Sequence, residues 1–361
     1  MSKIAVDFRM MSASGIGTYL SHTVPLVIAA LAQHDFILIG DKQAIQSHSW
    51  ANKNHIQIID NQAPIYSLSE QFNWLTTHRI KADLFWSPHY NIPLFFSGKL
   101  LVTIHDVFHL AMPQFVAGIH KRYYAKAMFS MVNRKAERII CDSRFTAEEL
   151  TRLTGTGPDK MSVIPLGVDQ HWFHLPREAS PHSRQYLLYV GNVKPHKNLT
   201  RLLSAFESLL ENIPHDLVIA GKKEGFITGD NAIAAQAEKL GKRIKFTGFI
   251  NDRSLEQYYA HAEALLLPSL YEGFGLPPLE AMACGCPAIV SNTASLPEVC
   301  ADAAIYFDPY CVADIAAKIQ QIVKNKQLRS ELRIKGTARA EQFNWDETAR
   351  QTCAVIEEIL Q

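Results

Sequence analysis

The stretch of sequence that decides the fold runs from residue 268 to residue 299 and reads PSLYEGFGLPPLEAMACGCPAIVSNTASLPEV. It follows an apolar run at residues 264–267 that has the length and composition of a buried strand. A glycine-rich loop comes next, and Pro277 and Pro278 then open a helix, where their missing N–H groups would have no helical partner anyway. A further apolar run lies at residues 288–290. This order of strand, loop, helix and strand is typical of a parallel α/β sheet.

The same alternation of apolar strands and helices continues outward in the rest of the chain. In the first half, strands are predicted at residues 3–8, 36–40, 55–59, 83–86, 100–104, 138–141 and 161–164. In the second half, they are predicted at residues 186–190, 216–220, 243–246, 264–267, 288–290 and 304–307. Such strands indicate parallel sheets that are buried on both faces. We therefore predict two doubly wound α/β domains, at residues 1–166 and 185–344, joined by a proline-containing linker at residues 167–184.

The composition excludes several classes of protein. The 361 residues carry 36 Lys and Arg against 35 Asp and Glu, a net charge of +1, and 47% of them are hydrophobic. Such a chain is too apolar to be disordered throughout, and it lacks the basic excess of a general nucleic-acid binder. No apolar run reaches about 18 residues, so no transmembrane helix is predicted. Asp7 and Arg9 interrupt the segment where a secretory signal would need its apolar core, and we expect a cytoplasmic protein.

The net charge is divided unevenly between the two predicted halves. Residues 1–166 hold 16 basic and 12 acidic side chains, a balance of +4, and the remainder holds 20 and 23, a balance of −3. The basic excess is concentrated between Lys121 and Arg138, in a predicted helix with interleaved aromatic residues. A basic amphipathic helix can lie on an anionic membrane surface or meet an anionic acceptor. An ordinary surface helix with one face in the core is the alternative.

The loop after residues 264–267 has the features of an anion site. Glycines between Glu272 and Leu276 let backbone N–H groups approach a ligand closely, and the following helix start adds partial positive charge. Glu280 lies one turn inside that helix, where its carboxylate could accept hydrogen bonds from the vicinal diol of a ribose. Glu272 would lie nearer to the chemical group that is attached to the phosphate. The alternative is a tight strand-to-helix connection that carries two solvated glutamates.

Other patterns in the chain point to no separate site. Gly15 and Gly17 lack the third glycine of a dinucleotide fingerprint, and no P-loop sequence occurs. For the pair His105 and His109 we expect no carboxylate or thiol to complete a metal-binding set, and the six cysteines show no second pair at zinc-ligand spacing. Cys284 and Cys286 are therefore interpreted as free thiols. No metal site is predicted.

Together, these residues resemble the donor signature of retaining glycosyltransferase family four. Glu272, seven residues and Glu280, within YEGFGLPPLEAMACGCPAIV, carry the resemblance. The other matching motifs span the whole chain: GIGTY at residues 15–19, like the family's glycine-rich loop; IHD at 104–106, like its catalytic histidine; IPLGVD at 164–169, like its interdomain passage; GNVKPHKN at 191–198, like its diphosphate-binding turn; and FNW at 343–345, at its last helix.

The resemblance implies the GT-B fold, with two Rossmann-like domains that face an interdomain cleft. It implies that the first domain binds the acceptor and includes the last helix, at about residues 345–361, and that the second binds a nucleotide sugar. The residues it implies fall into three groups: catalytic His105, Lys197 and Glu272; donor-binding Gly191, Asn192, Lys197, Gly273, Phe274, Gly275, Leu276 and Glu280; and an acceptor loop of Gly15, Ile16, Gly17 and Asp106.

One position departs from the family pattern. Many members have an arginine directly after the glycine of the diphosphate-binding turn, and here that residue is Asn192. The sequence leaves open whether Lys194 replaces the missing cation. The segments expected to read the base of the nucleotide lie near Gly221 and Lys222 and at residues 248–250, and they distinguish neither a purine nor a pyrimidine.

The function implied is a retaining hexosyltransferase of bacterial polysaccharide assembly. The PHKN turn and the HDVFH stretch resemble the mannosyltransferase branch, so GDP-mannose is the first candidate donor, with dTDP- and UDP-sugars as alternatives. The acceptor would be a glycan or lipid-linked saccharide, with possible contact to the inner membrane surface through the helix from Lys121 to Arg138. We expect front-face substitution without a metal ion or other cofactor. A nucleotide-sugar epimerase and a non-catalytic sugar-nucleotide binding protein are the competing hypotheses.

Overall fold

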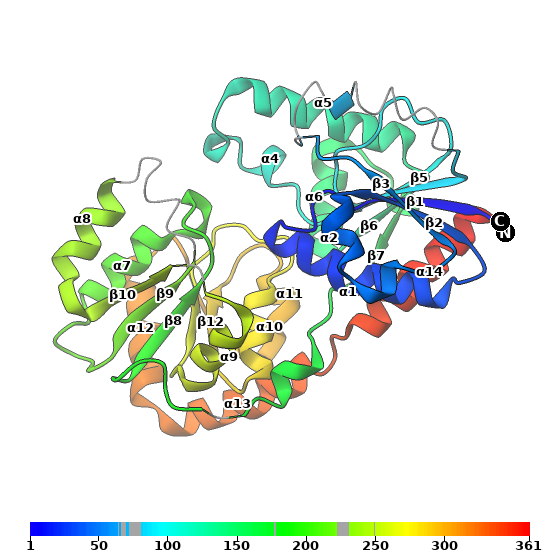
Figure 1. Ribbon diagram of the computed structural model, residues 1–361. Coiled ribbons are helices and arrows are strands. Elements are labelled where there is room, and N and C mark those ends of the chain that lie inside the picture. The colour runs from blue at the N-terminus through cyan, green and yellow to red at the C-terminus, as the bar shows by residue number, and fades with distance from the viewer. Residues whose placement is uncertain (64, 66–69, 72–80, 177, 222–230, 249) are drawn as a thin grey trace. The chain divides into compact units, whose positions relative to one another are not determined.

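The computed structural model describes the chain except residues 64, 66–69, 72–80, 177, 222–230 and 249 (Figure 1). The chain divides into two compact units. Unit 1 contains Met1–Gly167 and Trp345–Gln361, and unit 2 contains Val168–Asn344. In the described part of the chain, none of the helices has both the length and the apolar character needed to span a membrane. Lys222 and residue 249, in the predicted base-reading segments, lie outside the described residues.

Unit 1 is built on a seven-stranded sheet in the order β3-β2-β1-β4-β5-β6-β7, and every neighbouring pair is parallel. The order reverses beside β1, so the carboxyl ends of β1 and β4 mark the switch point at which such sheets bind ligands. The strands are β1 (Lys3–Asp7), β2 (Asp35–Gly40), β3 (Ile56–Asp60), β4 (Leu84–Ser87), β5 (Lys99–Ile104), β6 (Arg138–Cys141) and β7 (Met161–Val163).

The helices of unit 1 come from both ends of the chain. They are α1 (Ser14–Ala30), α2 (Lys42–Gln46), α4 (Phe108–Ala111), α5 (Ile119–Lys135), α6 (Arg144–Thr154) and α14 (Trp345–Leu360). The C-terminal helix α14 packs against α1 (Figure 1). The indole of Trp345 stacks on the His22 ring at 4.9 Å, and the Thr348 hydroxyl donates to the Pro165 carbonyl at 2.7 Å. These contacts hold the last helix in unit 1.

Unit 2 repeats the architecture with a six-stranded parallel sheet in the order β10-β9-β8-β11-β12-β13. Its strands are β8 (Tyr186–Val190), β9 (Asp216–Ala220), β10 (Ile244–Gly248), β11 (Leu265–Leu267), β12 (Ala288–Ser291) and β13 (Ala304–Phe307). Its helices are α7 (Leu199–Glu207), α8 (Asn231–Leu240), α9 (Asp252–His261), α10 (Leu276–Ala283), α11 (Leu296–Cys300), α12 (Val312–Lys324) and α13 (Lys326–Ala340). All thirteen predicted strands are present, and the predicted α/β class is confirmed.

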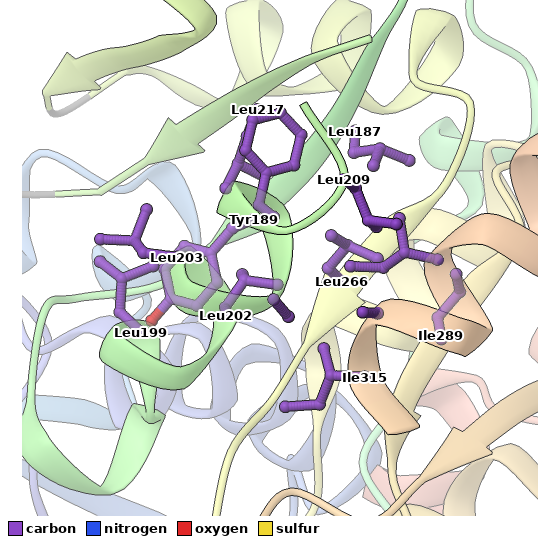
Figure 2. Close-up of a cluster of buried hydrophobic side chains, with 14 of the residues drawn as sticks. Leu187, Tyr189, Leu199, Leu202, Leu203, Leu209, Leu217, Leu266, Ile289 and Ile315 are labelled. Carbon is purple, nitrogen blue, oxygen red and sulfur yellow. The ribbon is translucent and has the colours of Figure 1, made fainter. Parts of the chain in front are cut away.

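The core of unit 2 shows why its strands are so uniformly apolar. Figure 2 shows side chains of β8, β9 and β11, such as Leu187, Leu217 and Leu266, meeting those of α7 and α12. Each of these three leucines is fully buried. A strand covered by helices on both faces has no solvent side on which to carry polar residues. The polar residues of the sheet therefore collect where the strands end.

The predicted linker at residues 167–184 differs from the structure. Residues from Val168 onward belong to unit 2, and a short 3-10 helix, η4 (Gln170–Phe173), lies within this segment. Trp172 is 7% exposed and packs edge-on against Tyr259 of α9, with ring centroids 5.6 Å apart. Prolines and histidines made the segment resemble a solvated connection, but one large aromatic side chain is enough to anchor it to the core.

Asn198 joins the turn after β8 to the rest of unit 2. It has a left-handed backbone, with φ of +59°, and is 4% exposed. Its side-chain amide donates to the carbonyl oxygens of Pro268 and Pro309 at 3.0 and 2.8 Å. One side chain thus connects the turn after β8 with the segments that follow β11 and β13.

Replacing Asn198 with Ala should lower the free energy of unfolding by about 2–3 kcal/mol, because two buried carbonyl groups lose their donors. Urea denaturation followed by circular dichroism measures this. Asn212→Ala, at an exposed asparagine, is the control and should change the free energy of unfolding by less than about 0.5 kcal/mol. Equal effects of the two substitutions would contradict the role given to Asn198.

Candidate active-site residues

The turn after β8 and the loop after β11 bring Lys197 and Glu272 together. The Lys197 Nζ lies 2.6 Å from Glu272 Oε1 and 2.8 Å from Oε2. The Ser269 hydroxyl donates to the same Oε1 at 2.6 Å. The two charged side chains are only 21% and 13% exposed. A cation and a carboxylate from segments 75 residues apart therefore form one partly buried pair at the carboxyl edge of the sheet.

Residues at the start of α11 contact the glycine-rich loop that follows Glu272 and fix its position. Gly275 has a φ of +107°, and a Cβ there would lie 2.8 Å from a methyl group of Leu296, so a larger residue would strain the loop. The fully buried Ser295 hydroxyl lies 2.9 and 2.8 Å from the carbonyl oxygens of Glu272 and Phe274. These contacts set the path of the loop into α10.

Phe274 of this loop has different surroundings from those expected of a ligand contact. Phe274 is 5% exposed, and its ring packs edge-on against Phe343 at 5.8 Å. A ligand could therefore contact the backbone of Phe274 but not its side chain. Because Pro277 and Pro278 carry no N–H, the backbone donors nearest the start of α10 are those of the residues before them, up to Leu276. An oxyanion there would meet a short run of amides beside Lys197.

Glu280 is oriented by a buried tyrosine. The hydroxyl of Tyr259, a fully buried residue of α9, donates to Glu280 Oε2 at 3.0 Å. Burial and the neighbouring carboxylate raise the pKa of Tyr259 well above its usual value, so the phenol keeps its proton and remains a donor. Sequence analysis missed Tyr259, because nothing in the motif links it to a carboxylate 21 residues away.

The glycine after β9 allows its backbone to pack closely against the turn after β8. A Cβ on Gly221, after β9, would lie 2.1 Å from the Gly191 carbonyl oxygen, so the ends of β8 and β9 approach more closely than side chains allow. Asn192 follows at a partly buried position, with its carbonyl 3.4 Å from the Tyr189 hydroxyl. Lys194 is exposed at the start of η5 (Pro195–Lys197). Its ammonium group makes none of the contacts found around Glu272 in the described structure.

In unit 1, His105 follows β5 directly and Asp142 follows the neighbouring strand β6. The His105 Nδ1 lies 2.6 Å from Asp142 Oδ2, and its Nε2 lies 3.0 Å from the Pro88 carbonyl oxygen. Burial lowers the pKa of His105, but the charge of Asp142 and the hydrogen bond to it outweigh burial, so the His105 pKa is raised. Sequence analysis missed Asp142, although its place at the end of an adjacent parallel strand was a usable signal.

The predicted acceptor loop is divided between two segments. Gly15, Ile16 and Gly17 form the first turn of α1, and a Cβ on Gly17 would lie 2.3 Å from the Met11 carbonyl oxygen. Asp106 lies after β5, where its Oδ1 accepts a hydrogen bond from the Phe108 backbone N–H at 2.9 Å and so orients the start of α4.

A buried charge network near β1 was also missed by sequence analysis. Arg9 Nη2 lies 2.6 Å from Asp7 Oδ2 and 2.7 Å from Glu70 Oε1, and all three side chains are at most 6% exposed. Burial alone would lower the pKa of Arg9, but the two carboxylates raise it. Glu70 lies 61 residues from Arg9 in the sequence, so no local pattern pointed to this contact.

No described group of three or more His, Cys, Asp or Glu side chains could hold a metal ion. The six cysteines are free thiols. Burial raises the pKa of Cys286 to about 12, so its thiol stays protonated near neutral pH.

Comparison with known proteins identifies the family. The description "Glycosyl transferases group 1" matches residues 171–339, and "Glycosyltransferase Family 4" matches residues 56–172. The chain is 32% identical to O-antigen chain mannosyltransferase B of Escherichia coli, over 70% of this chain and 69% of that protein. It is 29% identical to the GDP-mannose-dependent alpha-(1-6)-phosphatidylinositol dimannoside mannosyltransferase of Mycobacterium tuberculosis, over 71% and 68%. A longer E. coli mannosyltransferase is matched over 29% of its length.

A solved structure supports the fold independently. Sucrose-phosphate synthase from Thermosynechococcus elongatus superposes with a TM-score of 0.78 at 22% identity, over 100% of this chain and 99% of that one. At this identity the likeness concerns the fold alone. The two family descriptions and the relative above 30% identity show that the chain belongs to glycosyltransferase family 4 and is a hexosyltransferase. Its two parallel sheets give it the GT-B fold.

Proposed function

We propose that this enzyme transfers mannose from GDP-mannose to a glycan or lipid-linked saccharide in bacterial polysaccharide assembly, with retention of configuration. The observation that carries the proposal is the Lys197–Glu272 pair beside the start of α10. The mannosyl choice is supported by the names of relatives that act in O-antigen and phosphatidylinositol mannoside synthesis, one of which is GDP-mannose-dependent.

The charges of the pair fit a nucleotide diphosphate sugar. Lys197 would exchange one anionic partner, Glu272, for the diphosphate, whose charge grows as the bond to the sugar breaks. Glu272 would then be released to accept hydrogen bonds from sugar hydroxyls. The amides of residues 273–276 would hold further diphosphate oxygens. With this cation and these donors in place, we propose that the reaction needs no metal ion.

The proposed chemistry is a front-face substitution. A retaining enzyme that works through a covalent intermediate needs a carboxylate nucleophile at the reacting carbon. Glu280 is engaged with Tyr259, and Glu272 keeps its contact with Ser269 and would accept hydrogen bonds from sugar hydroxyls, so we assign that task to neither. The leaving diphosphate oxygen would instead accept the proton of the attacking hydroxyl, on the same face of the sugar.

Purified enzyme should transfer radiolabelled mannose from GDP-mannose to extracted lipid-linked saccharides, give an α-linked product, and remain active in excess EDTA. Lys197→Ala should reduce transfer by about 100-fold or more, because a cation that stabilises the leaving group is lost. Lys324→Ala, at an exposed lysine of α12, is the control.

Each part of the proposal can fail separately in this assay. Transfer from a UDP- or dTDP-sugar in place of GDP-mannose would contradict the donor. Loss of transfer in EDTA would contradict the metal-free reaction, and a β-linked product would contradict retention. Donor rearrangement without an acceptor would indicate an epimerase.

Tyr259→Phe should weaken binding of the nucleotide by about 5- to 10-fold, because Glu280 loses the donor that orients it toward a ribose diol. Isothermal titration with GDP measures this. Tyr258→Phe removes a hydroxyl from the adjacent position of α9 and serves as the control. Unchanged affinity in the Tyr259 variant would argue against the ribose role of Glu280.

We further propose that α5 contacts an anionic membrane surface. Its outer face carries exposed Arg122 and Lys126, together with Ile119 and Tyr123, which are 68% and 67% exposed, and Lys121 is exposed in its first turn. The opposite face is buried in unit 1 through Ala125, Met128, Phe129 and Val132. Cations with interspersed exposed apolar side chains suit a surface of acidic headgroups.

Substitution of Lys121, Arg122 and Lys126 with Ser should reduce sedimentation with phosphatidylglycerol-containing vesicles by 10-fold or more, at about 1 kcal/mol per cation. Substitution of Lys242, Lys324 and Lys326, three exposed lysines of unit 2, removes the same charge and should have little effect. Equal losses in both triple variants would indicate nonspecific attraction and contradict the role of α5.

A further inference from the structure

His105 is held at both ring nitrogens. The register of β5 and β6 pairs Ile104 with Cys141, so the next residues, His105 and Asp142, leave the sheet side by side. The ring spans from Asp142 Oδ2, 2.6 Å from Nδ1, to the Pro88 carbonyl oxygen, 3.0 Å from Nε2. A carbonyl oxygen can only accept a hydrogen bond, and so can an ionised carboxylate. Both contacts with such partners are satisfied when the ring carries two protons.

The surroundings of Asp142 indicate what this carboxylate is for. It is 1% exposed, and its Oδ1 has no hydrogen-bond partner among the residues that the structure describes. Carboxylates buried for structural reasons normally accept several hydrogen bonds, since burial of a charge is costly. The His105 ring is the one side chain in the described structure that Asp142 contacts by a hydrogen bond. An adjacent positive charge on that ring offsets the cost of burying the carboxylate.

The other groups around the ring do not compete for this proton. Tyr19 of α1 packs edge-on at 4.9 Å, and burial raises its pKa, so it stays a neutral phenol. Burial and the charge of His105 lower the pKa of His89, so it stays neutral too. Burial likewise raises the pKa of the Cys141 thiol. Asp106 adds a second negative charge that favours the protonated ring.

We propose that Asp142 is a positioning residue that holds His105 as an imidazolium, with one N–H donated to Asp142 and the other to the Pro88 carbonyl. His105 then supplies a fixed positive charge and an oriented ring, and it has no bare nitrogen with which to take a proton from the acceptor. The statement about the acceptor proton rests on the transfer reaction proposed above. It agrees with a reaction in which the acceptor proton goes to the leaving diphosphate oxygen.

The alternative places the shared proton on Asp142 and leaves a neutral ring. Burial raises the pKa of Asp142, against the attraction of His105, and so acts in that direction. In water, however, imidazole is the stronger base by about 2.6 pH units. The charge of Asp106 adds to this preference. We therefore assign the proton to the ring.

Nitrogen NMR of the full-length protein labelled with ¹⁵N-histidine tests this without any substrate. Both ring nitrogens of His105, assigned by their disappearance in His105→Gln, should be protonated from pH 6 to pH 8. In Asp142→Asn the midpoint of His105 titration should fall by about one pH unit or more, because the ion pair is lost while the side-chain shape is kept. The signals of His182, whose Nε2 lies 2.8 Å from Asp216 Oδ2 in unit 2, report whether the variant remains folded there.

A bare nitrogen on His105 of the unmodified protein at pH 7 would overturn the proposal, and this measurement does not depend on the folding of any Asp142 variant. An unchanged titration in folded Asp142→Asn would also overturn it. These outcomes stand apart from failure of the proposed function, because no donor is present.

The kinetic consequence has a definite sign. A raised pKa keeps the proton on His105 through neutral pH. Ionisation of His105 should therefore cause no change in kcat of the unmodified enzyme across that range. In Asp142→Asn, kcat should decline as pH rises through the lowered His105 midpoint, and KM for the donor should change by less than about twofold. Loss of activity that is the same at every pH would indicate a merely structural role and contradict the assignment.

Discussion

Burial of the central strands of two parallel sheets is the constraint on which the rest of this structure depends. A parallel strand covered by helices on both faces is apolar along its length, so charged groups are confined to the residues where strands end. Asp7, His105 and Asp142 follow or end β1, β5 and β6, and Lys197 and Glu272 follow β8 and β11. Parallel strands place all their carboxyl ends at one edge, which gathers distant parts of the sequence into one polar region in each unit.

In each of these polar regions a cation is paired with at least one carboxylate. In unit 2, Lys197 is held by Glu272, and in unit 1, Arg9 is held by Asp7 and Glu70. Partly buried charges are stable only with partners of opposite sign, and the desolvation cost grows as a partner is removed. A polyanionic ligand can replace a carboxylate partner without leaving the cation unpaired. The same rule therefore underlies both the stability of the sheet edge and the diphosphate binding that we propose for Lys197.

The parts of the candidate site that sequence predicted are those encoded within a single turn or loop. Glu272, the glycine-rich loop and Glu280 lie within nine residues, and Lys197 lies in one short turn, so their residue types carried the signal by themselves. The partners that orient them were not predicted. Tyr259 reaches Glu280 across 21 residues, and Asp142 reaches His105 across 37, through strand register and helix packing that no local motif records.

By itself, the sequence determined the α/β class, the thirteen strands and the residue types at the edges of both sheets, because apolar runs and glycine or proline breaks are local properties. The tertiary structure decided which of those residues meet. It paired His105 with Asp142, oriented Glu280 through Tyr259, and bound the proline-containing segment around Trp172 to unit 2 instead of leaving it a free linker. Such contacts depend on strand order and side-chain packing, which arise only when segments far apart in the chain are buried together.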